Sequence, residues 1–153
     1  SELKYFKPPV SHMQLDRIER ELGFALPINL RVMFEWHAVV IGIWGSIDIN
    51  CEMLVQSRRE WKKLAAEIGN EPVTVRGPVR GVFYDDGRLY FAAGQFLGNG
   101  TRKEYFVDLH PPESGAIGQI GAIDIDDQAV EWVAPNLEQF LSMGIEQLIT
   151  ELG

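Results

Sequence analysis

The spacing of apolar residues near the start of the chain predicts a first helix that ends at Gly23. Ser11 and Gln14 have the spacing of a capping box, in which the Ser11 hydroxyl accepts a backbone N–H and Gln14 reaches back to the cap. Apolar residues then recur at helical spacing at Leu15, Ile18 and Leu22. Gly23 suits the left-handed conformation that commonly ends a helix.

Two more helices are predicted before residue 70. One begins at Pro27, where the missing N–H costs nothing. Its apolar face comprises Leu30, Met33 and Phe34. The other begins at a second capping box, formed by Ser57 and Glu60. Its apolar face comprises Trp61, Leu64, Ala65 and Ile68, and it ends at Gly69.

The middle and C-terminal parts of the chain have the pattern of short strands. Residues 38–49 are rich in Val and Ile and predict a strand with a bend at Gly42 or Gly45. Residues 73–84 and 88–93 flank the turn signal Asp85-Asp86-Gly87, which predicts an antiparallel hairpin. Further strands are predicted over residues 104–109, 118–125 and 129–133.

A last helix is predicted to follow the strands. Asn136 can cap it, and Gly144 is expected to kink or break it. Helices at both ends of a run of hairpin-connected strands favour the α+β class. We expect one domain over residues 1–153, with an N-terminal helix pair and a C-terminal helix packed on a single, mostly antiparallel sheet.

Composition is that of an ordinary globular domain. The 153 residues are 46% hydrophobic and 24% charged, and the single cysteine, Cys51, allows no intrachain disulfide. No apolar run approaches the ~20 residues that span a bilayer. The N-terminus lacks the layout of a secretory signal. These features predict a cytoplasmic protein that does not bind membranes.

The basic residues are distributed unevenly. Residues 1–103 carry all 14 lysines and arginines and 12 acids, whereas residues 104–153 carry 10 acids and no base. The chain as a whole has a formal net charge of −8. A surface of one sign attracts cationic partners and repels nucleic acid, so we expect a cationic protein partner and no nucleic acid. Arg58, Arg59, Lys62 and Lys63 interleave with acids and predict only a solvated helix face.

The sequence contains no established motif for metal binding or catalysis. The three histidines are far apart: His12, His37 and His110. With one cysteine they disfavour a zinc site, and the cluster Asp124, Asp126 and Asp127 lacks the Gly and distal Glu of a calcium loop. The glycine-rich residues 94–100 lack the lysine of a phosphate-binding loop. We therefore expect no enzymatic activity, no cofactor and no metal.

Four segments, in order along the chain, carry the pattern of a known family. Residues 18–27 resemble an "I-x-x-x-E-x-x-L-G-x-x-L-P" signature, and residues 77–79 with 89–93 are similar to a central hairpin. Residues 105–120 resemble a D-x-x-P…G-x-x-G-Q-V stretch, and residues 133–141 resemble a closing helix. Together they are similar to the SUKH superfamily. After the second helix, where the family usually has Asn-Gly, this chain has His37-Ala38-Val39-Val40.

The resemblance implies an α+β domain without catalytic residues. Members of the family include bacterial immunity proteins, which bind and neutralise a polymorphic toxin domain, and fungal cell-wall assembly regulators. Gln119 falls in the best-matched stretch, and we expect its side chain to hydrogen bond to a neighbouring loop rather than to a ligand.

Two functional hypotheses follow. In the first, the protein is an immunity-like module that binds a cationic toxin domain through an acidic face of Asp124, Asp126, Asp127 and Glu131. Asp124 and Asp126 would share one face of a regular strand. Trp44, between Gly42 and Gly45, is the tryptophan expected to be exposed for binding. In the second, residues 37–50 bind a peptide or another copy of the chain, with no toxin partner.

Overall fold

The structure is a computed structural model, and it describes residues 9–36, 46–68, 75–76, 87–95, 102–111, 115–126 and 129–152. The helices are α1 (His12–Leu22), α2 (Ile28–Trp36), α3 (Met53–Ile68) and α4 (Leu137–Leu152). The strands are β1 (Ser46–Ile49), β2 (Val75–Arg76), β3 (Arg88–Gln95), β4 (Arg102–Asp108), β5 (Gln119–Asp124) and β6 (Val130–Ala134). None of the described helices combines the length and apolarity that crossing a membrane requires.

The described strands form one sheet in the order β1-β3-β4-β5-β6-β2. Strands β1, β3, β4, β5 and β6 are antiparallel neighbours, and only β2 joins the sheet in parallel, beside β6. This arrangement confirms the predicted α+β class and the mostly antiparallel sheet. Of residues 73–84, which were predicted to form a hairpin with residues 88–93, the structure describes only β2 (Val75–Arg76). The prediction is wrong for β2, which does not pair with β3. Among the described residues, β2 pairs with β6, whereas β3 pairs with β4 and, over Ala92–Gln95, with β1.

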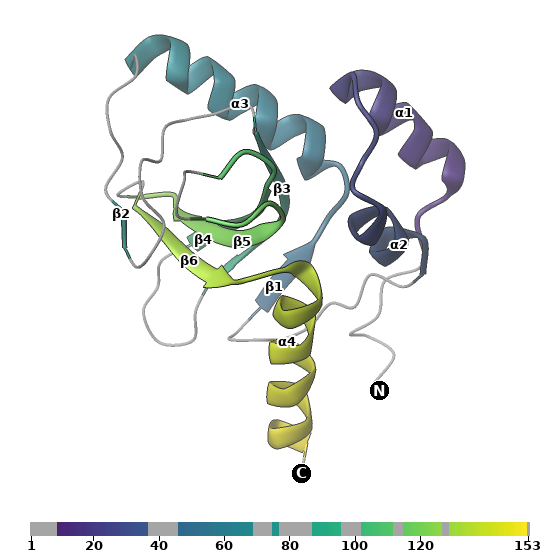
Figure 1. The fold of residues 1–153 in the computed structure, drawn as a ribbon, viewed down its shortest axis with the longest axis vertical. Helices are drawn as coiled ribbons and strands as arrows, with labels where there is room; N and C mark the ends of the chain where they lie inside the picture. The colour runs from purple at the N-terminus through teal and green to yellow at the C-terminus, as the bar shows by residue number, and fades with distance from the viewer. Residues whose placement is uncertain are drawn as a thin grey trace.

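The helices lie on both sides of the sheet (Figure 1). On one side, Phe91 and Tyr105 pack against Phe140 of α4, and α1 and α2 add their apolar faces to the same core. We call this the α4 face. On the other side, Tyr90 and Phe106 form a smaller cluster with residues of α3, and we call this the α3 face. Successive strand residues point to opposite sides, so β3, β4, β5 and β6 each supply both clusters.

The first helix begins and ends as predicted. The Ser11 hydroxyl accepts the Gln14 backbone N–H at 3.1 Å, and Gly23 ends the helix with φ of 85°. The second half of the expected capping box is wrong, because the Gln14 side chain donates to Glu52 at 2.8 Å instead of reaching back. That contact joins α1 to the segment that leads into α3.

Two helix boundaries differ from the prediction. Helix α3 begins at Met53 rather than after Ser57, because Leu54 is fully buried in the core and Asn50 accepts the Glu52 N–H before the first turn. Ser57 is buried within the helix. Helix α4 passes through Gly144 without a break. An interior glycine costs about 0.5–1 kcal/mol, which is less than the ~1.5–3 kcal/mol gained by burying a residue such as Phe140.

Gly23→Ala is expected to lower the free energy of unfolding by about 1–2 kcal/mol. A Cβ at Gly23 would meet no atom within 4 Å, so the cost comes from the left-handed backbone alone. Urea denaturation measures the loss, and Gly23→Asn is the matched control because Asn tolerates this conformation better. Equal losses for the two variants would contradict this explanation.

The motif around Gln119 links β4 to the start of β5. Gln119 Nε2 donates to Asp108 at 3.1 Å, and Gln119 Oε1 accepts the Ala116 N–H at 3.2 Å. Gly118, with φ of 89°, donates its N–H to the Asp108 carbonyl at 2.7 Å. The prediction that Gln119 bonds to a neighbouring loop is therefore confirmed, and its partners are structural.

Candidate functional site

The predicted acidic face is not built as expected where the structure describes it. Strand β5 ends at Asp124, so Asp124 and Asp126 do not share a strand face. Asp124 is buried, and its Oδ1 accepts the Asp126 backbone N–H at 2.9 Å. Asp126 is exposed in the turn that follows. The expectation of a shared strand face is therefore wrong, because the chain turns directly after Asp124.

Glu131 is engaged within the protein. Its carboxylate forms an ion pair with Lys103, whose side chain is only 9% exposed. Lys103 is the last basic residue of the chain, and it neutralises an acid of the base-free segment. The two other residues predicted for binding, Asp127 and Trp44, lie outside the described residues.

The other described acids of residues 104–153 do not gather on one surface. Asp108 is buried beside Gln119, whereas Glu138 and Glu146 are exposed on α4. Glu104 lies in the wall of a cleft on the α3 face. The acidity of the segment is thus divided between internal contacts and separate surface positions.

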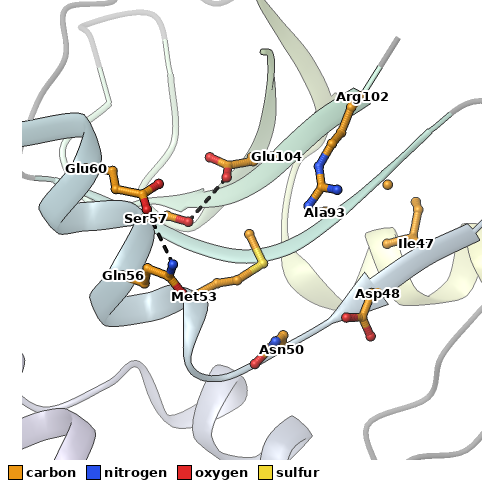
Figure 2. Close-up of a pocket in the computed structure, with 11 residues that line it drawn as sticks. Ile47, Asp48, Asn50, Met53, Gln56, Ser57, Glu60, Ala93, Arg102 and Glu104 are labelled. Carbon is orange, nitrogen blue, oxygen red and sulfur yellow. Dashed lines mark hydrogen bonds between the residues drawn. The ribbon is translucent and has the colours of Figure 1, made fainter. Parts of the chain in front are cut away.

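A cleft of about 600 Å³ lies between α3 and the neighbouring strands (Figure 2). Helix α3 contributes one wall, and β1, β3 and β4 contribute the other. The lining residues are Ile47, Asp48, Asn50, Met53, Gln56, Ser57, Glu60, Ala93, Gly94, Arg102 and Glu104. A volume of this size is within the usual range for ligand sites.

The shape of the cleft follows from the side chains under α3. At the middle of the helix, Trp61 stacks on Tyr90 with ring centroids 5.9 Å apart, which closes the space between helix and sheet. Near the start of the helix, the sheet presents the small residues Ala93 and Gly94. Small residues on β3 leave space between the sheet and α3 there.

Glu104 is the most enclosed carboxylate of the cleft. Its Oε2 accepts the Trp61 indole N–H at 2.7 Å, and its Oε1 accepts the Ser57 hydroxyl at 3.3 Å. Burial raises the pKa of Glu104, although both hydrogen bonds favour the ionised form. Glu60 also raises this pKa, and Arg102 lowers it. The site therefore holds a desolvated carboxylate in a fixed position.

The charges around the cleft are mainly negative. Asp48 and Glu60 lie near its opening, and Glu104 lies in its wall, against the single guanidinium of Arg102. Three carboxylates and one guanidinium leave a net charge of −2 if all are ionised. Figure 2 shows Ser57 and Glu60 on α3 facing the β4 side chains across the cleft. Such an arrangement can attract and bind a cationic group.

Sequence patterns alone did not identify this site. Asp48 and Glu60 belong to the part of the chain with near-balanced charge, and only Glu104 belongs to the base-free segment. The available signal was the alternation of β4, which places Arg102 and Glu104 on one side of the sheet and Lys103 on the other. Pairing that side with α3 requires the tertiary fold.

A metal centre is not evident within the described ranges. No three residues among their His, Cys, Asp and Glu are grouped to hold a metal ion. The cleft offers carboxylates, amides, a hydroxyl and a guanidinium. These groups suit hydrogen bonding and ion pairing with a partner.

Comparison of the chain with known proteins gives no family assignment. The chain matches no protein-family model and no curated protein. What the protein binds is therefore inferred from the cleft and from the resemblance seen in the sequence.

Glu104→Gln is expected to gain stability relative to the wild type as the pH rises from about 4 to 7. Burial raises the pKa of Glu104 on folding. Its contribution to the free energy of unfolding is therefore fully present below the unfolded pKa, and it is lost as the pH rises through the folded pKa. Urea denaturation at both pH values measures the difference. Glu138→Gln, an exposed change of equal charge, is the control. A pH-independent difference for Glu104→Gln would contradict the effect of burial.

Proposed function

We propose that this protein is a non-enzymatic binding module whose acidic cleft receives a basic segment of a protein partner. The observation that carries the proposal is the cleft of about 600 Å³ with carboxylates on both walls. Complementary charge speeds the encounter of two proteins and disfavours wrong partners. The same charge disfavours nucleic acid and anionic membranes as partners.

The partner we propose is a cationic toxin domain. The resemblance to the SUKH superfamily supports this class, because immunity proteins of that family bind and neutralise toxin domains. Toxins that act on nucleic acid need basic surfaces to contact phosphates. An acidic cleft can compete for those surfaces, and a cytoplasmic location would place the protein where such a toxin acts.

Growth rescue tests this function. A panel of strongly basic nuclease toxin domains is expressed in bacteria together with the wild-type chain, and rescue of growth by at least one pairing is expected. Asp48→Lys with Glu60→Lys should abolish that rescue, because it reverses the charge at the cleft opening. Asp126→Lys with Glu138→Lys is the matched control and should retain it. Failure of every pairing, or equal loss with both double variants, would refute the toxin-binding role of the cleft.

The alternative is a scaffold domain that binds a peptide or itself through residues 37–50. Residues 37–45 of this segment lie outside the described residues, and β1 occupies residues 46–49 at one edge of the sheet. Light scattering separates the two functions. The cleft-binding function predicts a monomer at micromolar concentration, whereas self-association predicts a larger particle.

A further inference from the structure

The cleft contains a carboxylate whose geometry restricts what can bind it. Ser57 and Trp61 donate one hydrogen bond to each oxygen of Glu104, and both donors come from α3. An ionised carboxylate has about four lone-pair positions, two on each oxygen. One acceptor position therefore remains on each oxygen, and Glu104 lines the cleft.

Two acceptor positions on one carboxylate fit a guanidinium better than an ammonium. A guanidinium presents two N–H groups in a planar fork and forms paired hydrogen bonds with a carboxylate, whereas an ammonium acts as a point charge. A guanidinium is also more weakly hydrated, so it enters an enclosed site at lower cost. Because Glu104 is held on both oxygens by α3, it is oriented before a ligand arrives.

We propose that the cleft takes one arginine side chain of the partner, whose guanidinium forms a two-point ion pair with Glu104. This inference rests on the proposed function and specifies the group that is recognised. The side chains of Met53 and Ala93 line the same cleft and can pack against the methylene groups of the arginine. Asp48 and Glu60, nearer the opening, contribute longer-range attraction.

Arg102 opposes this ligand and therefore tunes its affinity. It lines the same cleft, and it lies two residues from Glu104 on the same side of β4. Its positive charge repels an incoming guanidinium, and removing that charge should tighten binding.

The test uses three blocked tripeptides that differ in one side chain: acetyl-Gly-Arg-Gly-amide, its lysine analogue and its citrulline analogue. Citrulline has nearly the shape of arginine without the charge. Each is titrated at constant ionic strength while the NMR signal of the Trp61 indole N–H is followed, because that group bonds directly to Glu104. The arginine peptide should bind about tenfold more tightly than the citrulline peptide, and more tightly than the lysine peptide.

Variants complete the test. Glu104→Gln keeps the shape of the side chain and should weaken the arginine peptide about tenfold, whereas Arg102→Gln should strengthen it. Asp126→Asn, an exposed change of the same charge away from the cleft, is the control and should leave the affinity unchanged.

The outcomes separate this inference from the proposed function. Equal binding of the arginine and lysine peptides, or arginine binding that survives Glu104→Gln, would overturn the guanidinium site. Growth rescue that depends on Asp48 and Glu60 could still hold in that case, and the cleft would then bind its partner by overall charge. An arginine peptide that leaves the Trp61 indole signal unchanged would also overturn the inference.

Discussion

Phe140→Ala is expected to lower the free energy of unfolding by about 3–5 kcal/mol, the usual cost of removing a buried aromatic ring. Phe140 is fully buried on the α4 face. The centroid of its ring lies 5.6 Å from that of Phe91 and 5.5 Å from that of Tyr105. Phe140 therefore joins α4 to two adjacent strands, β3 and β4. Urea denaturation followed by circular dichroism measures the loss.

Phe140→Leu is the matched control for this prediction. It keeps an apolar side chain in the same space, so its cost should be clearly smaller. The Trp61 indole signal should stay in place in both folded variants, because the cleft lies on the opposite side of the sheet. A loss below about 1 kcal/mol for Phe140→Ala would contradict the position of α4 in the core.

Gln119→Glu is expected to destabilise the protein by several kcal/mol at neutral pH. Gln119 is buried, and its side-chain amide donates to the buried Asp108 carboxylate. The change replaces that donor with a second carboxylate, and a buried like-charge pair is strongly unfavourable. The loss should shrink as the pH falls toward 4, because protonation of either acid removes the repulsion and restores a donor.

Gln119→Ala separates the two causes of that loss. It removes the same hydrogen bonds without adding charge, so it should cost about 1.5–3 kcal/mol at neutral pH and depend less on pH than Gln119→Glu. Denaturation at neutral and acidic pH compares the two variants. A loss for Gln119→Glu that does not depend on pH would contradict the direct contact with Asp108.

Local chemistry explains the parts of the fold that could be predicted from sequence. Ser11 marks the start of α1 because its hydroxyl accepts a backbone N–H of the first turn. Gly23 marks the end of α1 because glycine adopts the left-handed conformation readily. Asn136 caps α4 in the same way, and its Oδ1 accepts the Gln139 N–H at 2.8 Å. Strands over residues 104–109 and 118–125 were predicted from the sequence, and β4 and β5 lie there as antiparallel neighbours.

The errors arise where tertiary contacts override a local signal. Ser57 has the sequence of a capping residue, yet Glu104 on β4 accepts its hydroxyl and the burial of Leu54 extends the helix beyond it. Gly144 resembles a helix break, yet it is buried within a continuous α4. In both cases the competing contact comes from residues distant in sequence.

The site was harder to predict than the fold. The sequence indicated Asp124 and Glu131 as binding residues. In the structure, Asp124 is buried and Glu131 forms an ion pair with Lys103. The cleft acids Asp48, Glu60 and Glu104 come from three separate elements, β1, α3 and β4. No sequence period relates them, and only the packing of α3 over the sheet brings them to one cleft.

The cleft and the core therefore have separable roles. Residues of the α4 face hold α1, α2 and α4 to the sheet. The cleft on the α3 face contains Glu104, and burial raises the pKa of that carboxylate. An ionisable group whose pKa is perturbed by burial inside a cleft is a candidate functional residue. Variants of Glu104 should consequently change binding, and variants of Phe140 should change stability.

A chemical-shift map tests the central claim, that the cleft is the cationic binding site, most directly. The ¹⁵N-labelled protein is titrated at low salt with an octapeptide of alternating glycine and arginine. The account predicts that the largest shifts fall on Asp48, Ser57, Glu60, Ala93 and Glu104 and on the Trp61 indole. Shifts centred on Asp126, Glu138 and Glu146, with the cleft signals unchanged, would contradict it.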